Sequence, residues 1–507
     1  MADRWDAGII MQVLVIGALI ALVTKMGGMR AIADVISKIA KGPRSAQVAI
    51  WLSGWIIFFD DYANALIVGP IMRPVCDKFR ISRERLAYIV DSTAAPIAGI
   101  VLISTWIGTE LVNIGDGLAN AGITGVTAYR IFIDTIPFRF YNILALFFVL
   151  ATALLLRDYG PMLKAELRAR TTGETINPGS EVMEVDKTID EEKAEIREDH
   201  AILKTSKKVN APNIWNAVIP IGVLVLSAII LFYTNGYASI MDGGGAEAFA
   251  ALTFFEQIRD AYSASDASIV LFQAGLLACI VAIIMGFAQK IFTIKDGVET
   301  WAHGMKSMVF VCIILILAWS IGRVIKYVGT ADYLVGALSG ASEVAWIFPA
   351  IIFIFAALIS FATGTAYGTM AILLPLCIPL AAGLKSVTGM ALAAGTSEPY
   401  TFLILCSSAV LTGAIFGDHC SPISDTTILS SMGAGCSLMD HVGTQMWYAL
   451  TVAAVVVVCY ILAGIGLNVW ITLLVGAALC VGILFLIGKK VPTWKPEAKP
   501  DEKKSAE

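Results

Sequence analysis

The sequence has little charge and lacks the short motifs of several large enzyme classes. Lys, Arg, Asp and Glu make up 15% of its 507 residues, whereas about 25% is usual for soluble globular chains. Neither HExxH, which binds zinc in many proteases, nor GxSxG, which carries the nucleophile of many hydrolases, occurs in it. Its nine cysteines have no CxxC spacing, so they indicate neither a disulfide framework nor a zinc site. These absences exclude a soluble globular class and disfavour an intramembrane protease or lipid transferase.

Long hydrophobic runs are what the chain has instead. Hydrophobic residues make up 57% of the sequence, and a helix needs about 20 consecutive apolar residues to cross a bilayer. Several runs approach or reach that length, and they are too long and too continuous for the strands of an outer-membrane barrel. The sequence therefore predicts an all-α polytopic membrane protein. The runs include 8–26, 140–156, 214–233, 268–287, 308–322, 447–465 and 469–488.

Basic residues predict how these runs are oriented, because Lys and Arg concentrate in cytoplasmic loops. They lie on both sides of the stretch 47–72, and about 25 residues with two cytoplasmic ends fit a re-entrant hairpin with two short arms. By alternation, segment 107–128 with Glu110 is external, as is the N-terminus of this chain, and the C-terminus is cytoplasmic. The flanking basic residues are Lys25, Arg30, Lys38, Lys41 and Arg44 before the stretch, and Arg73, Lys78, Arg80, Arg83 and Arg85 after it.

The chain divides into two membrane repeats with a charged segment between them. The second repeat has two apolar runs ahead of its helix at 308–329, whereas only seven residues precede the corresponding helix 8–26. We therefore expect that N-terminal helices are missing from the first repeat. Residues 181–199 lack an apolar face and are typical of a solvated helix or linker. The predicted parts are the first repeat 1–157, a cytoplasmic charged loop 158–212, the second repeat 213–490 and a cytoplasmic tail 491–507.

Two adjacent acids interrupt the first hairpin, in the sequence FDDYANALIVGPIMRP (59–74). A carboxylate at membrane depth costs roughly 2.5–3.5 kcal/mol or more, and such residues usually mark an ion or proton path. Adjacent residues point about 100° apart on a helix, so one of Asp60 and Asp61 faces a site, and its closeness to Asn64 favours Asp61. The alternative is that one acid caps a hairpin arm or pairs with a distant arginine.

The hairpin returns in altered form in the second half, as residues 343–383, which would enter from the opposite side. Its tip reads FATGTAYGTMAILLPLCIP (361–379), and a proline pair with four-residue spacing recurs 305 residues later. Likewise VDSTAAPIAGIVLISTW (90–106) resembles GDHCSPISDTTILSSMG (417–433). Interrupted helices at corresponding positions of two inverted repeats are the best sequence pointer to a transporter binding site. We predict two inverted-topology repeats with re-entrant hairpins and broken helices, the alternative being convergent use of Gly and Pro.

The polar residues at these four interruptions supply the oxygen ligands that sodium prefers. A buried carboxylate among them could hold either a cation or a proton. For Asp91 the alternative is a helix cap, and for His419 it is a polar residue at the break or a sensor of pH. We assign Na⁺ to Asp61, Asn64 and Asp425. The full set of candidate transport residues is Asp60, Asp61, Asn64, Asp91, Ser92, Thr93, Thr363, Thr365, Asp418, His419, Ser421, Ser424, Asp425 and Thr426, with Thr369 as a further hydroxyl.

Three long strings carry a resemblance to a known family: FFDDYANALIVGPIMRPV, DSTAAPIAGIVLISTWIGTE and GDHCSPISDTTILSS. In these the chain resembles the NhaC-type sodium/proton antiporter family of the ion transporter superfamily. The resemblance implies exchange of Na⁺ for H⁺ across a bacterial or archaeal plasma (inner) membrane, without enzymatic activity or a cofactor. Expected partners are membrane lipid and the two ions. A homodimer stays open, and no nucleic-acid partner is expected.

Coupled transport of a small organic acid or amino acid is the main alternative, because some members of the family resemble malate/lactate antiporters. The superfamily's dicarboxylate symporters carry Ser-Asn-Thr motifs at their hairpin tips. Here the tips read DDYAN and TGTAY, which disfavours a dicarboxylate site of that kind. A passive channel is also disfavoured, because paired and asymmetric carboxylates suit alternating access better than a conduction ring.

Overall fold

The chain is almost entirely helical, which confirms the predicted fold class. The computed structural model describes residues 4–28, 40–58, 61–101, 104–180, 213–244, 246–250, 264–309, 344–385 and 397–493, with a few isolated residues between these ranges. Within them, seven helices are long and apolar enough to cross a membrane, and a bent pair of helices makes an eighth candidate. Asp60, most of 308–329, the linker 181–199 and nearly all of the tail lie outside the described residues.

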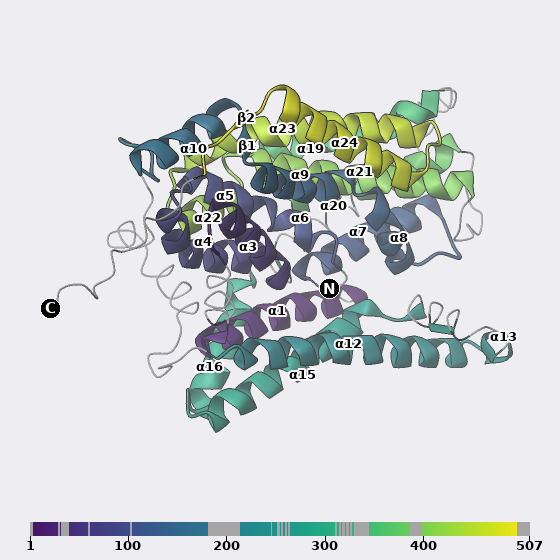
Figure 1. The fold of residues 1–507 in the computed structure, drawn as a ribbon. Helices are drawn as coiled ribbons and strands as arrows, with labels where there is room; N and C mark the ends of the chain where they lie inside the picture. Colours follow the sequence, from purple (N-terminus) through teal and green to yellow (C-terminus); the bar gives the residue numbers. More distant parts are fainter. Residues whose placement is uncertain are drawn as a thin grey trace.

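Four helices form a layer of their own below the rest of the molecule in Figure 1. They are α1 (Arg4–Lys25), α12 (Trp215–Asp242), α15 (Ala267–Ala288) and α16 (Ile294–Ser307). Helix α1 packs on α15 and α16, and α12 packs on α15. Gly304 allows the close approach of α16 to α1, because a Cβ there would lie 2.6 Å from Ala18 Cα.

Two helical hairpins make up the repeated units of the other layer. The first consists of α3 (Pro43–Ile56) and α4 (Asp61–Lys78), and the second of α19 (Phe348–Thr363) and α20 (Ala366–Leu384). Each arm of the second begins 305 residues after its counterpart, since 348 − 43 and 366 − 61 are both 305. The matched prolines lie inside α4 and α20 at equal distances from the helix starts, at Pro70 and Pro74, and at Pro375 and Pro379.

A broken helix follows each hairpin. In the first repeat it consists of α5 (Arg83–Ser92), the short α6 (Ala95–Ala98) and α7 (Thr105–Ala121), and in the second of α21 (Glu398–Cys420) and α22 (Asp425–Ala434). The halves exchange contacts: α4 of the first hairpin packs on α22, and α20 of the second packs on α7. This reciprocal pattern is what an inverted repeat requires, because the hairpin of each repeat packs on the helix that follows the break in the other repeat.

The crossing of α4 and α22 is so close that backbone touches backbone. A Cβ on Gly433 would lie 2.3 Å from Ala65 O, and one on Gly69 would lie 2.5 Å from the carbonyl carbon of Gly433. Small residues allow such approaches between membrane helices. The end of α22 is also held by two guanidinium groups, because Arg73 donates to Gly433 O at 2.8 Å and Arg83 to Ala434 O at 2.7 Å.

We expect that Gly433→Ala destabilises the protein by about 1–3 kcal/mol, the usual range for overpacking a well-packed interior. The added methyl group has no room beside Ala65 O, so α4 and α22 must separate. Thermal unfolding in detergent measures the loss. Gly443→Ala is the matched control, since a Cβ at Gly443 meets no atom within 4 Å. Equal melting temperatures for the two variants would contradict this account of the crossing.

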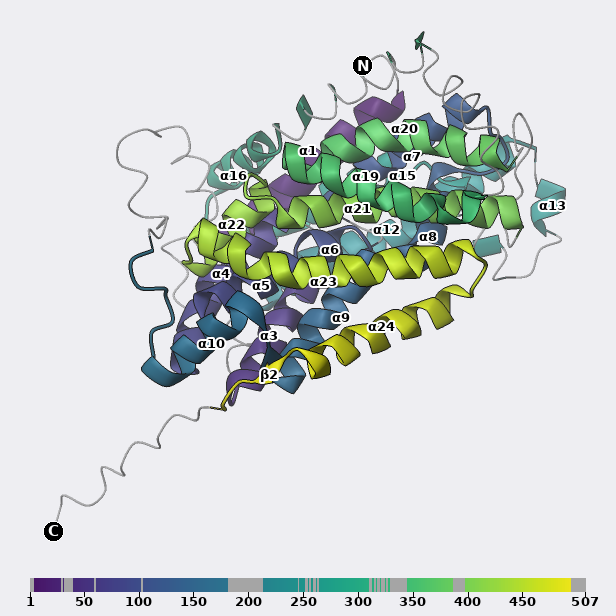
Figure 2. The ribbon, with the colours of Figure 1, turned by 90° about the horizontal axis from the view of Figure 1, so that it is seen from above.

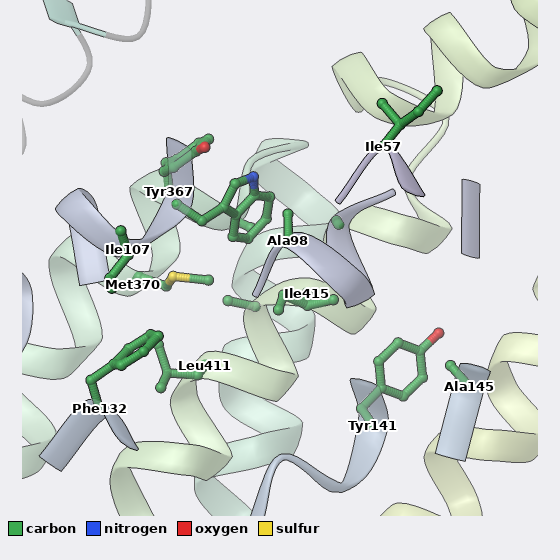
Figure 3. Packing of buried hydrophobic residues seen from close by; sticks show 14 of the residues in the cluster. Ile57, Ala98, Ile107, Phe132, Tyr141, Ala145, Tyr367, Met370, Leu411 and Ile415 are labelled. Carbon is green, nitrogen blue, oxygen red and sulfur yellow. The ribbon is translucent and has the colours of Figure 1, made fainter. Parts of the chain in front are cut away.

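The remaining helices pack on the broken helices or on one another, except for one short helix that contacts α12. They are α8 (Ala128–Thr135) with the 3₁₀ turn η1 (Ile136–Phe138), α9 (Phe140–Leu155), α10 (Gly160–Thr172), α13 (Ala246–Ala250), α23 (Leu438–Gly464) and α24 (Val469–Leu486). Helix α23 packs against both α21 and α24, and Figure 2 shows it running between them. Figure 3 shows part of the buried core, to which Ile107 of α7, Met370 of α20 and Leu411 of α21 contribute.

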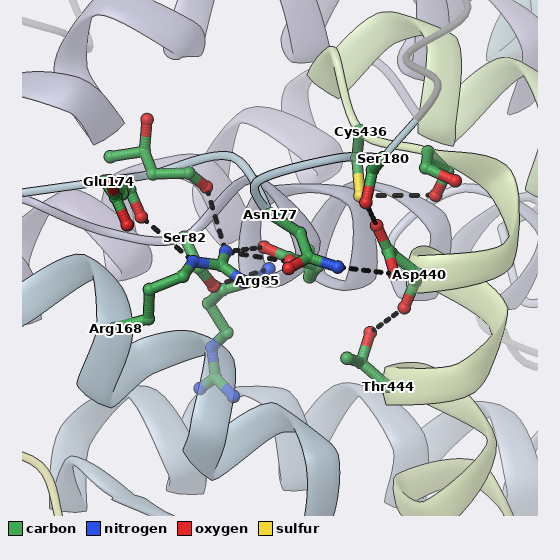
Figure 4. Close-up of polar contacts among 12 residues, drawn as sticks. Ser82, Arg85, Arg168, Glu174, Asn177, Ser180, Cys436, Asp440 and Thr444 are labelled. Carbon is green, nitrogen blue, oxygen red and sulfur yellow. Dashed lines mark hydrogen bonds and ion pairs between the residues drawn. The ribbon is translucent and has the colours of Figure 1, made fainter.

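Segments predicted to be cytoplasmic meet at one end of the molecule. Strand β1 (Arg157–Asp158) pairs antiparallel with β2 (Lys489–Lys490). Asn177 Nδ2 donates to Asp440 Oδ1 at 3.1 Å at the start of α23 (Figure 4). Arg168 pairs with Glu84 of α5 at 2.8 Å. This agreement concerns relative placement only, and the side of the membrane stays a prediction.

Two features of the structure go beyond the sequence-based expectations. Residues 105–121 form helix α7, and Glu110 is fully buried in an ion pair with Arg139 (2.6 Å), while the external side expected for segment 107–128 stays a prediction. The buried base compensates this acid, so the charge of Glu110 does not by itself indicate an exposed segment. Helix α23 contains nearly all of the apolar run 447–465 and begins nine residues earlier, at Leu438, because its first turns carry polar side chains that are buried.

Candidate ion-binding site

The tip of the first hairpin lies against the break of the helix that follows it. Asp61 is the first residue of α4 and is buried. One turn on, Asn64 Nδ2 donates to Thr93 O at 2.7 Å, between α5 and α6. Gly54 of the other arm faces the same threonine, where a Cβ would lie 2.4 Å from Thr93 Cβ. In the described part of the chain, Asn64 Oδ1 is buried without a hydrogen-bond partner, so one hard oxygen ligand remains available at this tip.

The tip of the second hairpin lies in the same way against the second break. Gly364 ends α19 with φ of +67°, and a Cβ there would lie 2.9 Å from Ile423 O. Ser421 Oγ donates to Phe361 O at 2.9 Å. The threonines of this tip serve their own helices: Thr363 donates to Ile359 O at 2.8 Å, and Thr365 caps α20. Their hydroxyls are thus engaged in hydrogen bonds within the hairpin.

Asp418, near the end of α21, is surrounded by hydroxyl groups of its own break. Ser424 Oγ donates to Asp418 Oδ1 at 3.0 Å, and Thr426 Oγ1 donates to Oδ2 at 3.2 Å. The two hydroxyls lie 3.0 Å apart, and all three side chains are buried. A hydroxyl can donate to a carboxylate or turn a lone pair toward a cation. These four oxygens therefore form a compact set of hard ligands around one negative charge.

The two breaks meet at His419. Its Nε2 lies 3.1 Å from Ser92 Oγ of the first repeat, and its Nδ1 lies 2.7 Å from Tyr141 OH of α9. Both are hydrogen bonds whose donor depends on the tautomer. Residues predicted independently in the two halves, at the ends of α5 and α21, are thus in direct contact.

Asp91, beside Ser92, receives hydrogen bonds from two helices of the second half. Its Oδ1 accepts from Ser430 of α22 at 3.4 Å, and its Oδ2 accepts from His441 Nε2 at 3.1 Å and Gln445 Nε2 at 2.6 Å, both of α23. Gln445 Nε2 also donates to His419 O. Asp91 and Asp418 occupy corresponding places near the ends of α5 and α21, yet the two shorter contacts to Asp91 come from distant imidazole and amide groups, whereas Asp418 accepts from nearby hydroxyls.

The structure unites part of the predicted set and adds residues to it. Asp60 and the side chain of Asp425 lie outside the described residues, so the predicted Na⁺ assignment to Asp425 stays a prediction. Two of the residues that sequence reasoning missed, His441 and Gln445, lie four residues apart just before an apolar run, and this spacing was the available signal. The contacts that sequence reasoning missed come from Tyr141, Ser430, His441 and Gln445. In the part of the chain that is described, no group of three or more His, Cys, Asp or Glu is suited to a metal ion.

Comparison with known proteins relates this geometry to transporters. The family model described as the Na+/H+ antiporter family matches residues 97–465. An uncharacterized protein of Haemophilus influenzae is 33% identical over 461 residues, which cover 90% of this chain and 79% of that protein. The malate-2H(+)/Na(+)-lactate antiporter of Bacillus subtilis is 28% identical over 111 residues, and an uncharacterized Na(+)/H(+) antiporter of Haemophilus influenzae is 31% identical over 109. Each of these two matches covers 22% of this chain and 20% of the relative.

A solved structure shows a similar fold. It is that of the Alcanivorax borkumensis YdaH transporter, described as having an unusual topology. The TM-score is 0.50 at 14% identity, and the match covers 90% of this chain and 86% of that one. At this identity the similarity concerns the fold alone.

Proposed function

Because the chain belongs to the Na⁺/H⁺ antiporter family, we propose that it exchanges Na⁺ for H⁺ across the plasma membrane by alternating access. The observation that carries this proposal is the buried Asp418 carboxylate with Ser424 and Thr426 around it. Sodium replaces the two donated hydrogen bonds by coordination to the same oxygens. A proton on the carboxylate removes its negative charge and so weakens this coordination. The two ions therefore compete for one site, which is what exchange requires.

The first hairpin supplies further ligands in this proposal. Asp61 and Asn64 lie at its buried tip, and Asn64 Oδ1 is free of hydrogen bonds to the described residues. Asp425 begins α22 and adds a second carboxylate from the other half. Alternating access then repacks each hairpin against the broken helix of the opposite repeat, at the contacts of α4 with α22 and α20 with α7. The basic residues of the loops and the alternation of the spans support an external N-terminus and a cytoplasmic C-terminus.

We expect that Asp61→Asn raises the half-saturating Na⁺ concentration about tenfold, equal to about 1.4 kcal/mol, because a neutral amide attracts the cation less than a carboxylate does. The assay measures Na⁺-induced dissipation of an imposed pH gradient in proteoliposomes. Asp242→Asn, an exposed acid at the end of α12, is the control and retains wild-type behaviour. An unchanged response in Asp61→Asn would remove this residue from the site.

Coupled exchange of an organic acid is the second candidate. The match to the Bacillus subtilis malate-2H(+)/Na(+)-lactate antiporter favours it over other substrates. The same proteoliposomes distinguish the two: exchange that runs at full rate without malate or lactate supports ion-only antiport. A Na⁺ response that appears only when malate or lactate is present supports the second candidate. In either case the ions are substrates and no cofactor is needed for the step.

A further inference from the structure

One buried network joins the two repeats through a helix that belongs to neither hairpin nor break. Helix α23 presents His441 and Gln445, one turn apart on the same face, to the carboxylate of Asp91. All three side chains are at most 1% exposed. Burying polar groups at membrane depth is costly unless they are paired. Three buried polar side chains that bond to one another therefore indicate a role beyond filling space.

Gln445 gives the network its second connection. Its amide nitrogen donates both to Asp91 Oδ2 in the first repeat and to His419 O in the second. The His419 ring in turn lies 3.1 Å from Ser92 Oγ, the neighbour of Asp91. The ends of α5 and α21 are therefore tied at two points, once through the His419 ring and once through Gln445.

Two of the three hydrogen bonds to Asp91 differ in kind from those that the Ser424 and Thr426 hydroxyls make to Asp418, and the third, from the Ser430 hydroxyl, is the longest at 3.4 Å. Amide and imidazole N–H groups donate hydrogen bonds and cannot ligate a cation through the same atoms, whereas the hydroxyls around Asp418 can. Asp91 is thus already compensated by fixed donors from another helix. These partners fit a carboxylate that holds the two breaks in position better than they fit a carboxylate that binds sodium.

We propose that His441 and Gln445 are positioning residues for exchange: they fix the Asp91 carboxylate, and Gln445 thereby couples the break of the first repeat to that of the second. This inference rests on the proposed exchange. Neither residue contacts Asp418, Ser424 or Thr426 in any hydrogen bond given above. Their loss therefore slows turnover, which depends on how the breaks move together, and leaves the half-saturating Na⁺ concentration unchanged.

The experiment compares His441→Leu, Gln445→Leu and His441→Gln in proteoliposomes, with rates normalised to folded protein in the membrane. We expect turnover to fall about tenfold in the two leucine variants, as for the loss of a hydrogen bond to a charged group. His441→Gln keeps a donor nitrogen and restores most of the rate. Thr444→Val is the matched control on the same helix, because the Thr444 hydroxyl bonds to the backbone of its own helix, at Asp440 O and His441 O.

A double variant tests whether His441 acts through Asp91. In the Asp91→Asn background, His441→Leu adds little further loss of turnover, because the carboxylate that it positions is gone. Wild-type turnover in both leucine variants would overturn the inference, and so would equal losses in folded His441→Leu and His441→Gln, or a change in half-saturating Na⁺ alone. Failure of the wild-type protein to exchange Na⁺ for H⁺ would instead overturn the proposed function on which the inference rests.

Discussion

Asp418→Asn is expected to abolish Na⁺-driven proton exchange in proteoliposomes. The variant keeps the size of the side chain and one oxygen, so Ser424 can still donate to it. It lacks the negative charge that attracts sodium, and it lacks the carboxylate that a proton can neutralise. Both halves of the exchange cycle fail together, so we expect at least about a hundredfold loss of rate, larger than any single-ligand effect.

The matched control is Glu398→Gln on the same helix. Glu398 is the first residue of α21, its side chain is 80% exposed, and its partner is Lys385 at 2.6 Å. Surface pairs of this kind contribute little to stability, typically about 0–1 kcal/mol. The control therefore retains wild-type exchange. Residual exchange of more than a tenth of the wild-type rate in folded Asp418→Asn would assign the transported ions to other carboxylates.

The hairpins could be predicted from sequence because their causes are local. The tips contain the residues that interrupt a helix, such as Gly364 with its positive φ, and the proline pairs fix the register of the two halves. The 305-residue offset read from Pro70 and Pro375 is the same offset that separates the helix starts. Local residue types and the internal repeat were therefore enough to predict both hairpins from the sequence.

The partners of the candidate residues could not be predicted in the same way, because they come from distant parts of the chain. Asp91 receives its donors from residues 350 and 354 positions later, His441 and Gln445. Their four-residue spacing ahead of an apolar run is visible in the sequence, but it does not indicate which distant residue they contact. The contact between His419 and Ser92 likewise depends on how the repeats interlock.

The corresponding carboxylates, Asp91 and Asp418, show how an inverted repeat can diverge in chemistry while keeping its backbone. Each lies near the C-terminal end of a helix that stops at a break, where the unpaired carbonyl groups of the last turn create a negative potential. Asp91 accepts its two shorter hydrogen bonds from N–H donors, whereas Asp418 accepts from two hydroxyls. We propose a divided role, in which the hydroxyl-lined site around Asp418 exchanges ions and the contacts of Asp91 hold the two halves together.

The second large effect concerns stability and the pair Glu110–Arg139. Both side chains are fully buried: Arg139 Nη1 and Nη2 donate to the Glu110 oxygens at 3.0 and 2.6 Å. Arg139 also donates to Thr135 Oγ1 and to Gly99 O, just after α6. The arginine thus ties α7 and the first break to the start of α9. Removing one partner leaves a buried charge without compensation, which costs about 3–5 kcal/mol.

We therefore expect that Glu110→Gln and Arg139→Gln each lower the melting temperature in detergent strongly, and that the double variant is more stable than either single one. With both charges gone, the remaining amides can pair and no ion has to be held away from water, so the desolvation cost disappears together with the attraction. Single variants as stable as the wild-type protein would mean that water reaches this pair. A double variant that loses the sum of the single effects would mean that the two residues act independently, despite the 2.6 Å contact between them.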